Sequence, residues 1–236
     1  MRVDKLLSEM GKASRKESAR LARLGKILVN GTAVKKCDIH VDPEKDEIVF
    51  CGERIVYKRF TYIMLNKPEG YVSATEDGYE KTVLDLLPEE ERRKNLFPCG
   101  RLDKNTLGLM ILTNDGENAH KLLSPKNHVS KTYRFKSKLP ISKEDKQRLE
   151  DGIDIGGYLT KPCKIELFDG SASGDITITE GKYHQIKRML EAVDNKITYL
   201  ERIAFGTISL DSSLGRGEWR YLTENEEKNL LEGENI

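Results

Sequence analysis

Pro98-Cys99-Gly100-Arg101-Leu102-Asp103, followed by Thr106-Leu107-Gly108-Leu109-Met110-Ile111-Leu112-Thr113, is the stretch that decides the fold of most of this chain. The apolar run that begins at Thr106 predicts a second, buried strand, and the segment 98–103 ends a shorter strand before it. Asp103 therefore lies in the turn between the two. From such a turn a carboxylate projects from a rigid sheet, where functional side chains are commonly placed. The alternative is an Asp that caps the turn through its own backbone.

Outward from this stretch, short β-like runs alternate with helical stretches from residue 60 to the end of the chain. The predicted strands are residues 62–65, 108–113, 131–136, 175–179 and 197–205. The predicted helices are residues 82–87, 116–123, 143–150, 184–193 and 224–231. This mixture predicts an α+β domain over residues 60–236.

The first 59 residues have a different pattern, which predicts a small separate α/β domain. Apolar residues between positions 3 and 24 recur at helical spacing and are interrupted near Gly11, so two short helices are expected. Ser14 and Glu17 have the spacing of a capping box at the start of the second helix. The Asn30-Gly31 pair predicts a hairpin, and a last strand is expected at residues 47–50. Residues 51–60 are then expected to be a linker.

Charge is distributed unevenly along the chain, although the whole sequence carries a formal net charge of only +1. Residues 1–36 contain ten Lys or Arg against three Asp or Glu, a net charge of +7. This excess predicts attraction to a polyanion such as RNA, and the alternative is a solvated amphipathic helix pair. The residues expected to bind RNA are Arg2, Lys5, Arg15, Lys16, Arg20, Arg23 and Lys26.

Composition also argues against several classes of protein. No apolar leader follows Met1 and no run of 18 apolar residues occurs, so we expect a cytoplasmic protein without a membrane partner. The four cysteines are widely separated and form no CxxC pair, which argues against a zinc site or a disulfide framework. We therefore expect no metal site.

Two groups of motifs resemble known families. Arg-Val-Asp-Lys at residues 2–5, Ser-Arg at 14–15 and Gly-Lys-Ile-Leu-Val-Asn-Gly at 25–31 resemble the S4 RNA-binding domain. Further along, Gly-Arg-Leu-Asp at 100–103 resembles the signature of the pseudouridine synthases.

Two more blocks match that second family in the same order, Lys-Thr-Tyr at residues 131–133 and Glu-Gly-Lys-Tyr-His-Gln-Ile-Lys-Arg-Met-Leu at 180–190. The segments 65–70 and 217–222 also look like the ends of its domain, so the resemblance covers nearly the whole chain. It implies a catalytic domain built on a mainly antiparallel mixed sheet with flanking helices.

The resemblance implies an activity and a set of site residues. Members of the family isomerise uridine to pseudouridine without a cofactor, using the Asp of the signature as nucleophile. Here that residue is Asp103, with Lys187 as the cation beside it and Tyr133 as the surface that stacks on uracil. The remaining residues expected to bind substrate are Arg101, Leu102, Lys131, His184, Gln185 and Arg188.

The third block also indicates a branch of the family. Tyr-His-Gln-Ile-Lys-Arg-Met resembles the small-subunit branch, which modifies uridine 516 of 16S rRNA, so the expected partner is 16S rRNA or an assembling small subunit. We expect a monomer. The alternatives are a large-subunit (23S) rRNA synthase of the same family, a non-catalytic S4-type assembly factor, and a hydrolytic glycosylase that releases free uracil.

Overall fold

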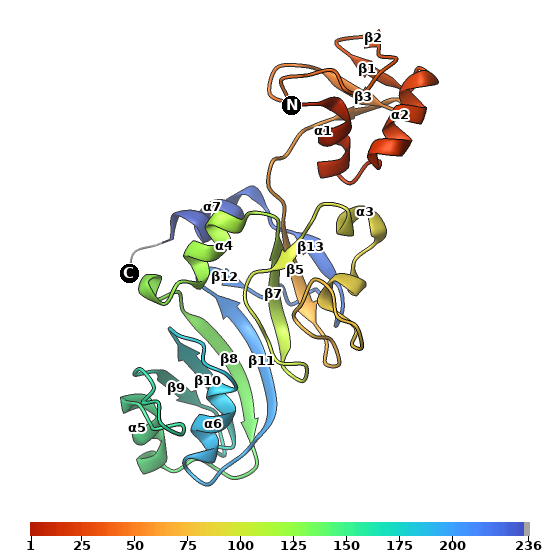
Figure 1. Ribbon diagram of the computed structural model, residues 1–236. Coiled ribbons are helices and arrows are strands. Elements are labelled where there is room, and N and C mark those ends of the chain that lie inside the picture. The colour runs from red at the N-terminus through yellow and green to blue at the C-terminus, as the bar shows by residue number, and fades with distance from the viewer. Residues whose placement is uncertain (234–236) are drawn as a thin grey trace. The chain divides into compact units, whose positions relative to one another are not determined.

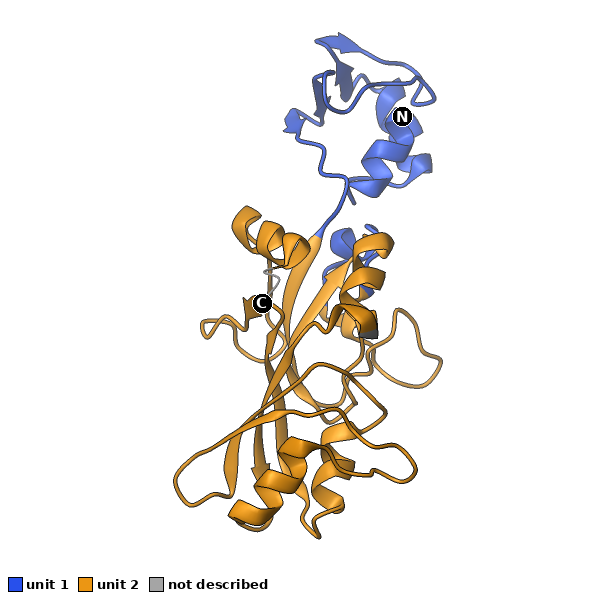
Figure 2. Cartoon of the chain, turned by 90° about the vertical axis from the view of Figure 1, so that its left-hand side faces the viewer, with its two compact units in different colours: residues 1–61, 87–97 blue, residues 62–86, 98–236 orange. Residues whose placement is uncertain are grey.

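The computed structural model describes residues 1–233 and divides them into two compact units (Figure 2). One unit comprises residues 1–61 and 87–97, and the other comprises residues 62–86 together with the chain from residue 98 onward. Each unit has its own sheet.

The first unit packs two helices against a small antiparallel sheet (Figure 1). The helices are α1 (Val3–Glu9) and α2 (Arg15–Arg23), and the short helix α3 (Glu89–Arg92) belongs to the same unit. The sheet has the order β2-β1-β3-β4 and consists of β1 (Ile27–Val29), β2 (Thr32–Ala33), β3 (Ile48–Phe50) and β4 (Glu53–Ile55). Its core contains Val3, Leu6, Leu7, Ala22, Ile27, Cys37, Val41, Ile48 and Ile55.

Local sequence signals explain these elements. The Ser14 hydroxyl accepts a hydrogen bond from the Glu17 N–H, and the Glu17 carboxylate accepts one from the Ser14 N–H, so the expected capping box starts α2. Asn30 and Gly31 both have positive φ between the paired residues Val29 and Thr32. This is the backbone of a two-residue hairpin turn, as the Asn-Gly pair predicts.

The expected linker at residues 51–60 is wrong in its first half. Cys51 and Gly52, with φ of 52° and 89°, form a two-residue turn, and β4 pairs with β3 directly after it. The strand escaped the sequence analysis because Glu53 and Arg54 are exposed edge residues, so only Ile55 adds to the core.

The second unit is an α+β domain around one mixed sheet, which confirms the fold class (Figure 1). The strand order is β13-β5-β7-β11-β8-β10-β9, and every pairing along it is antiparallel except the parallel pair of β7 and β11. Its strands are β5 (Tyr62–Lys67), β7 (Leu107–Thr113), β8 (Lys131–Ser137), β9 (Lys164–Leu167), β10 (Ser173–Ile178), β11 (Ile197–Phe205) and β13 (Trp219–Tyr221). The short β6 (Phe97–Pro98) leads into the Asp103 turn, and β12 (Ile208–Ser209) pairs with β11.

Helices flank this sheet, as expected, although the helix predicted at residues 82–87 is only a short 3-10 helix. They are α4 (Gly116–Leu123), α5 (Lys143–Asp151), α6 (Gln185–Glu191) and α7 (Glu224–Glu232), with 3-10 turns η1 (Val83–Leu86) and η2 (Pro125–Asn127). The helix α5 packs against strand β9, α6 packs against β11, and α7 packs against β12. None of the helices within residues 1–233 has the length and apolar character needed to cross a membrane.

The central strands of the sheet form the core of the second unit. All six residues of β5 are buried, and so is β7 from Gly108 onward. Gly108 has φ of 96°, and a Cβ there would lie 2.3 Å from the Arg202 carbonyl oxygen of β11. The close approach of β7 to β11 therefore requires glycine at the base of the Asp103 turn.

Candidate active site

The second unit contains a cavity of about 720 Å³, which is within the usual range for sites that bind small molecules. Three segments far apart in the sequence line it, within residues 72–77, 101–106 and 181–187. Tyr133, Ile178 and Leu200 complete the wall. The cavity therefore brings together the turn that carries Asp103, the middle of β8 and the start of α6.

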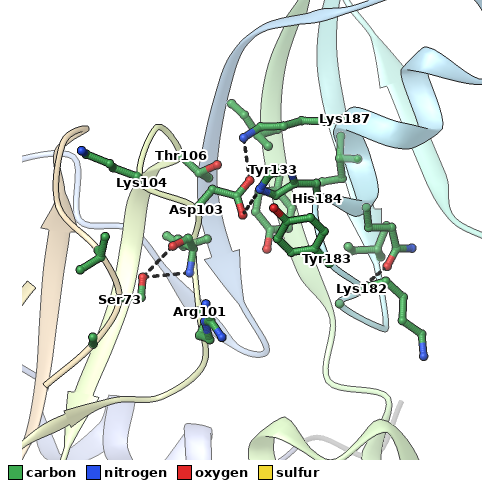
Figure 3. A pocket seen from close by; sticks show the side chains of 18 of the residues that line it. Ser73, Arg101, Asp103, Lys104, Thr106, Tyr133, Lys182, Tyr183, His184 and Lys187 are labelled. Carbon is green, nitrogen blue, oxygen red and sulfur yellow. Dashed lines mark hydrogen bonds and ion pairs between the residues drawn. The ribbon is translucent and has the colours of Figure 1, made fainter. Parts of the chain in front are cut away.

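The backbone of the Asp103 turn is held on both sides of the carboxylate. The Thr106 N–H donates to the Asp103 carbonyl at 3.0 Å, which closes the turn. Before it, Leu102 is tied by the Ser73 hydroxyl, which accepts from the Leu102 N–H at 3.0 Å and donates to its carbonyl at 2.8 Å. The Asp103 side chain thus projects from a fixed loop (Figure 3).

Beneath the turn lies Lys67, the last residue of β5 and fully buried. Its ammonium is within 2.9–3.1 Å of four carbonyl oxygens, those of Pro68, Asp103, Lys104 and Thr106. Burial lowers the pKa of Lys67 to about 8, although the Asp103 charge acts to raise it. Three of its four acceptors, the carbonyls of Asp103, Lys104 and Thr106, belong to the turn that carries Asp103. Lys67 therefore fixes the position of this turn relative to the sheet.

We expect Lys67→Met to lower kcat by roughly tenfold to a hundredfold, because it would displace Asp103, the expected nucleophile, and small displacements of a reacting group are costly. Methionine keeps an aliphatic stem but leaves the four carbonyls without their shared donor. Steady-state kinetics on substrate RNA measures the effect. A wild-type kcat in the folded variant would contradict this function of Lys67.

The carboxylate of Asp103 faces two basic side chains from the start of α6 (Figure 3). Lys187 Nζ lies 2.6 Å from Asp103 Oδ2, and His184 Nε2 lies 3.5 Å from Oδ1. The side chains of Asp103 and Lys187 are each 27% exposed, so the pair is only partly screened by solvent. The Asp103 carboxylate is therefore paired with a lysine and still partly open to a ligand.

The loop that leads into α6 is held by a buried carboxylate. Glu180 accepts hydrogen bonds from the Tyr158 hydroxyl at 2.6 Å, the Lys161 N–H at 3.0 Å and the Gln185 amide at 2.8 Å. Burial acts to raise the pKa of Glu180, but these hydrogen bonds outweigh it and the pKa is lowered. The amide oxygen of Gln185 accepts from the Lys182 N–H at 2.9 Å, so both ends of this side chain brace the loop.

Tyr133 reaches the cavity from β8, in register with Ile176 of β10 and Arg202 of β11. Its side chain is 8% exposed, and its neighbours on adjacent strands fix the orientation of the ring. The residue therefore forms part of the wall of the cavity that Asp103 also lines.

Of the other predicted substrate-binding residues, four line the cavity and two do not. Arg101 is exposed and Leu102 is buried, and both line the cavity, as do His184 and Gln185. Lys131 does not line it: its ammonium donates to the Val129 carbonyl at 2.9 Å and lies over the Phe205 ring. Arg188 does not line it either, and its guanidinium donates to the Ile155 carbonyl.

The basic residues predicted to bind RNA are all exposed in the first unit. Arg2 and Lys5 form ion pairs with Asp4 and Glu9. The other five form no ion pair with any carboxylate that the structure describes. They are Arg15, Lys16, Arg20, Arg23 and Lys26, and four of them lie on α2.

Possible metal ligands are dispersed. Within residues 1–233 no three His, Cys, Asp or Glu side chains are grouped to hold a metal ion. The four cysteines are free thiols, and burial raises the pKa of Cys99 to about 11.

Sequence analysis missed Lys67, Ser73 and Glu180 as parts of the site. Lys67 had a signal, because a lysine so soon after the apolar run Tyr62–Leu65 is unusual, and Glu180 opens the third matched block.

Comparison with known proteins identifies two families along the chain. The RNA pseudouridylate synthase family matches residues 61–192, and the S4 domain family matches residues 1–48. Among solved structures, a crystal structure of a pseudouridylate synthase is 35% identical, with a TM-score of 0.69, and the match covers 98% of this chain and 99% of that one.

Curated relatives match over nearly the full length. An uncharacterized RNA pseudouridine synthase of Bacillus subtilis is 50% identical over 96% of both chains. The ribosomal small subunit pseudouridine synthase A of Yersinia pestis is 40% identical over 96% of both chains, and that of Escherichia coli is 37% identical over 96% of this chain and 98% of the relative. With an S4 domain ahead of the matched catalytic region, this chain belongs to the RNA pseudouridylate synthase family.

Proposed function

We propose that this enzyme isomerises a specific uridine of 16S rRNA, equivalent to uridine 516, with Asp103 as nucleophile and without a cofactor. The observation that carries the proposal is the Asp103–Lys187 ion pair beside the Tyr133 ring in one cavity. The full-length similarity to small-subunit synthases supports the choice of 16S rRNA. We propose that the protein acts as a cytoplasmic monomer.

The reaction breaks the N1–C1′ bond of uridine, rotates the uracil and joins C5 to C1′; C5 then loses its proton and N1 gains one, so that the product is an isomer of uridine. An ionised carboxylate can attack C1′, attack C6 or remove a sugar proton, and Asp103 suits each path. The Lys187 ammonium stabilises the negative charge of the Asp103 carboxylate through the 2.6 Å contact. Tyr133 stacks on the uracil while it is detached.

The remaining predicted residues surround this centre. Arg101 and Leu102 contact the substrate from the turn, and His184 holds the RNA at the edge of the cavity. Gln185 acts through the loop it braces, and Lys131 and Arg188, which do not line the cavity, contact the RNA outside it.

A stacked uridine cannot reach Asp103, so the enzyme must flip it out of the RNA at a cost of a few kcal/mol. We propose that residues 1–59 act as an RNA-binding domain that offsets this cost, and residues 60–236 as the catalytic domain. The net charge of +7 in residues 1–36 and the S4 match support this division.

Replacing Arg15, Lys16, Arg20 and Arg23 with Gln should weaken RNA binding and flatten its salt dependence. Each lost phosphate contact should reduce the slope of log K against log salt by roughly 0.7–0.9. Titrations at several salt concentrations measure the slope. The matched control is Gln at Lys45, Lys121, Lys146 and Lys164, which are paired with acids, and an equal effect there would refute the RNA-binding assignment.

Tyr133→Phe should retain the stacking face and most of the activity, whereas Tyr133→Ala should lose both. Base stacking is worth roughly 1–3 kcal/mol, so the alanine variant should lose about tenfold or more in RNA affinity. Binding and product formation are measured together. Equal effects of the two substitutions would argue that Tyr133 does not stack on the base.

In vitro modification of separated rRNAs tests the proposed function. Purified protein should form pseudouridine at one site in 16S rRNA, either naked or in a partly assembled small subunit. Product in 23S rRNA alone would assign the large-subunit function instead. Binding without product would favour an assembly factor, and free uracil would indicate a glycosylase.

A further inference from the structure

Two aromatic rings are stacked at the edge of the cavity, next to the reacting carboxylate. The rings of Tyr183 and His184 have centroids 3.9 Å apart and an interplanar angle of 17°. Both residues line the cavity, and His184 Nε2 lies 3.5 Å from Asp103 Oδ1 (Figure 3). The His184 ring of the stack therefore lies next to the Asp103 carboxylate.

The second ring faces solvent. Tyr183 is 75% exposed. Neither its hydroxyl nor its ring has another partner within residues 1–233. The neighbouring Lys182 ammonium lies over the Tyr158 ring, 4.2 Å from its centroid, and so leaves the Tyr183 ring accessible.

The backbone holds the stack in place. His184 is a non-glycine residue in the left-handed region, with φ of 51°, directly before α6. Such a conformation costs free energy and is retained where the surroundings impose it. Here Glu180 and Gln185 fix the loop on either side of the stack. The strained backbone thus presents Tyr183 at a defined angle.

An exposed aromatic ring beside an RNA site is a stacking platform. When the target uridine is flipped, its neighbour in the RNA loses a stacking partner, and a ring at the cavity edge can replace it. On the basis of the proposed function, we propose that Tyr183 stacks on a nucleobase that flanks the flipped uridine. His184 backs the ring, so the stack extends from the flanking base toward Asp103.

The test combines protein variants with abasic RNA. A 16S rRNA fragment that the wild-type protein modifies is prepared with an abasic site at the nucleotide 5′ or 3′ of the target. For the wild type, one of these abasic sites should raise the KM about tenfold or more with little change in kcat. Tyr183→Ala should raise the KM equally on intact RNA and show no further loss on that abasic RNA.

Two further variants serve as controls. Tyr183→Phe should behave as wild type, because it keeps the ring, and Tyr183→Leu should behave as the alanine variant even if alanine impairs folding. Phe168→Ala removes another exposed aromatic residue of the same unit that does not line the cavity, and it should leave the KM unchanged.

Three results would overturn the proposal. They are a wild-type KM for Tyr183→Leu on intact RNA, an undiminished abasic effect in that variant, or a fall in kcat alone, which would mean that Tyr183 acts only by supporting His184. Each leaves the proposed function intact, since the wild-type protein still forms pseudouridine. A wild-type protein that forms none would refute both.

Discussion

We expect Asp103→Asn to abolish pseudouridine formation and to lower kcat by at least about ten-thousand-fold, because it removes the proposed nucleophile. Asparagine fills nearly the same space but lacks the charge that Lys187 contacts at 2.6 Å. It cannot attack carbon or accept a proton as a carboxylate does. The measurement is single-turnover product formation at saturating RNA.

The same variant should fold and bind RNA like the wild type. The side chains of Asp103 and Lys187 are each 27% exposed, and the turn is held by its backbone, so stability should change by about 1 kcal/mol or less. Thermal unfolding and RNA titration measure this. Substantial turnover by a folded, RNA-binding Asn variant would exclude Asp103 as the nucleophile.

Lys187→Met should lower kcat by roughly a hundredfold to a thousandfold, the usual cost of removing one preorganised electrostatic contact from a reacting centre. Methionine retains the packing of the side chain on α6 but leaves Asp103 without its nearest cation. His184 lies farther away, at 3.5 Å. Steady-state kinetics measures the change.

Lys187→Arg is the matched control for this prediction, because it keeps a cation within reach of Asp103. It should retain most of the activity that methionine loses. If the arginine and methionine variants are equally impaired, the function of Lys187 depends on its shape and not on its charge.

Much of the fold could be predicted because two kinds of local signal agree with the structure. The apolar run after Thr106 forms β7, buried on both faces, and residues 197–205 form β11 as predicted. Ser14 and Glu17 form the capping box. The missed strands β9 and β13 are short, with few buried positions, so they have little hydrophobic pattern.

Part of the site could be predicted, because its motifs place Asp103, Tyr133 and Lys187 on separate elements that the sheet brings together. The supporting contacts could not. Lys67 acts through backbone carbonyls of a turn 36 to 39 residues away, and such acceptors have no sequence signature. The stack of Tyr183 on His184 depends on a left-handed backbone at His184, which residue type alone does not specify.

The most direct test of the proposed function is a map of pseudouridines in rRNA from cells that lack the gene and are complemented with either the wild-type or the Asp103→Asn allele. We expect one pseudouridine of 16S rRNA, at the position equivalent to uridine 516, to disappear on deletion. It should return with the wild-type allele and stay absent with the Asp103→Asn allele at equal protein level. An unchanged 16S map, or full recovery with the Asp103→Asn allele, would contradict the account.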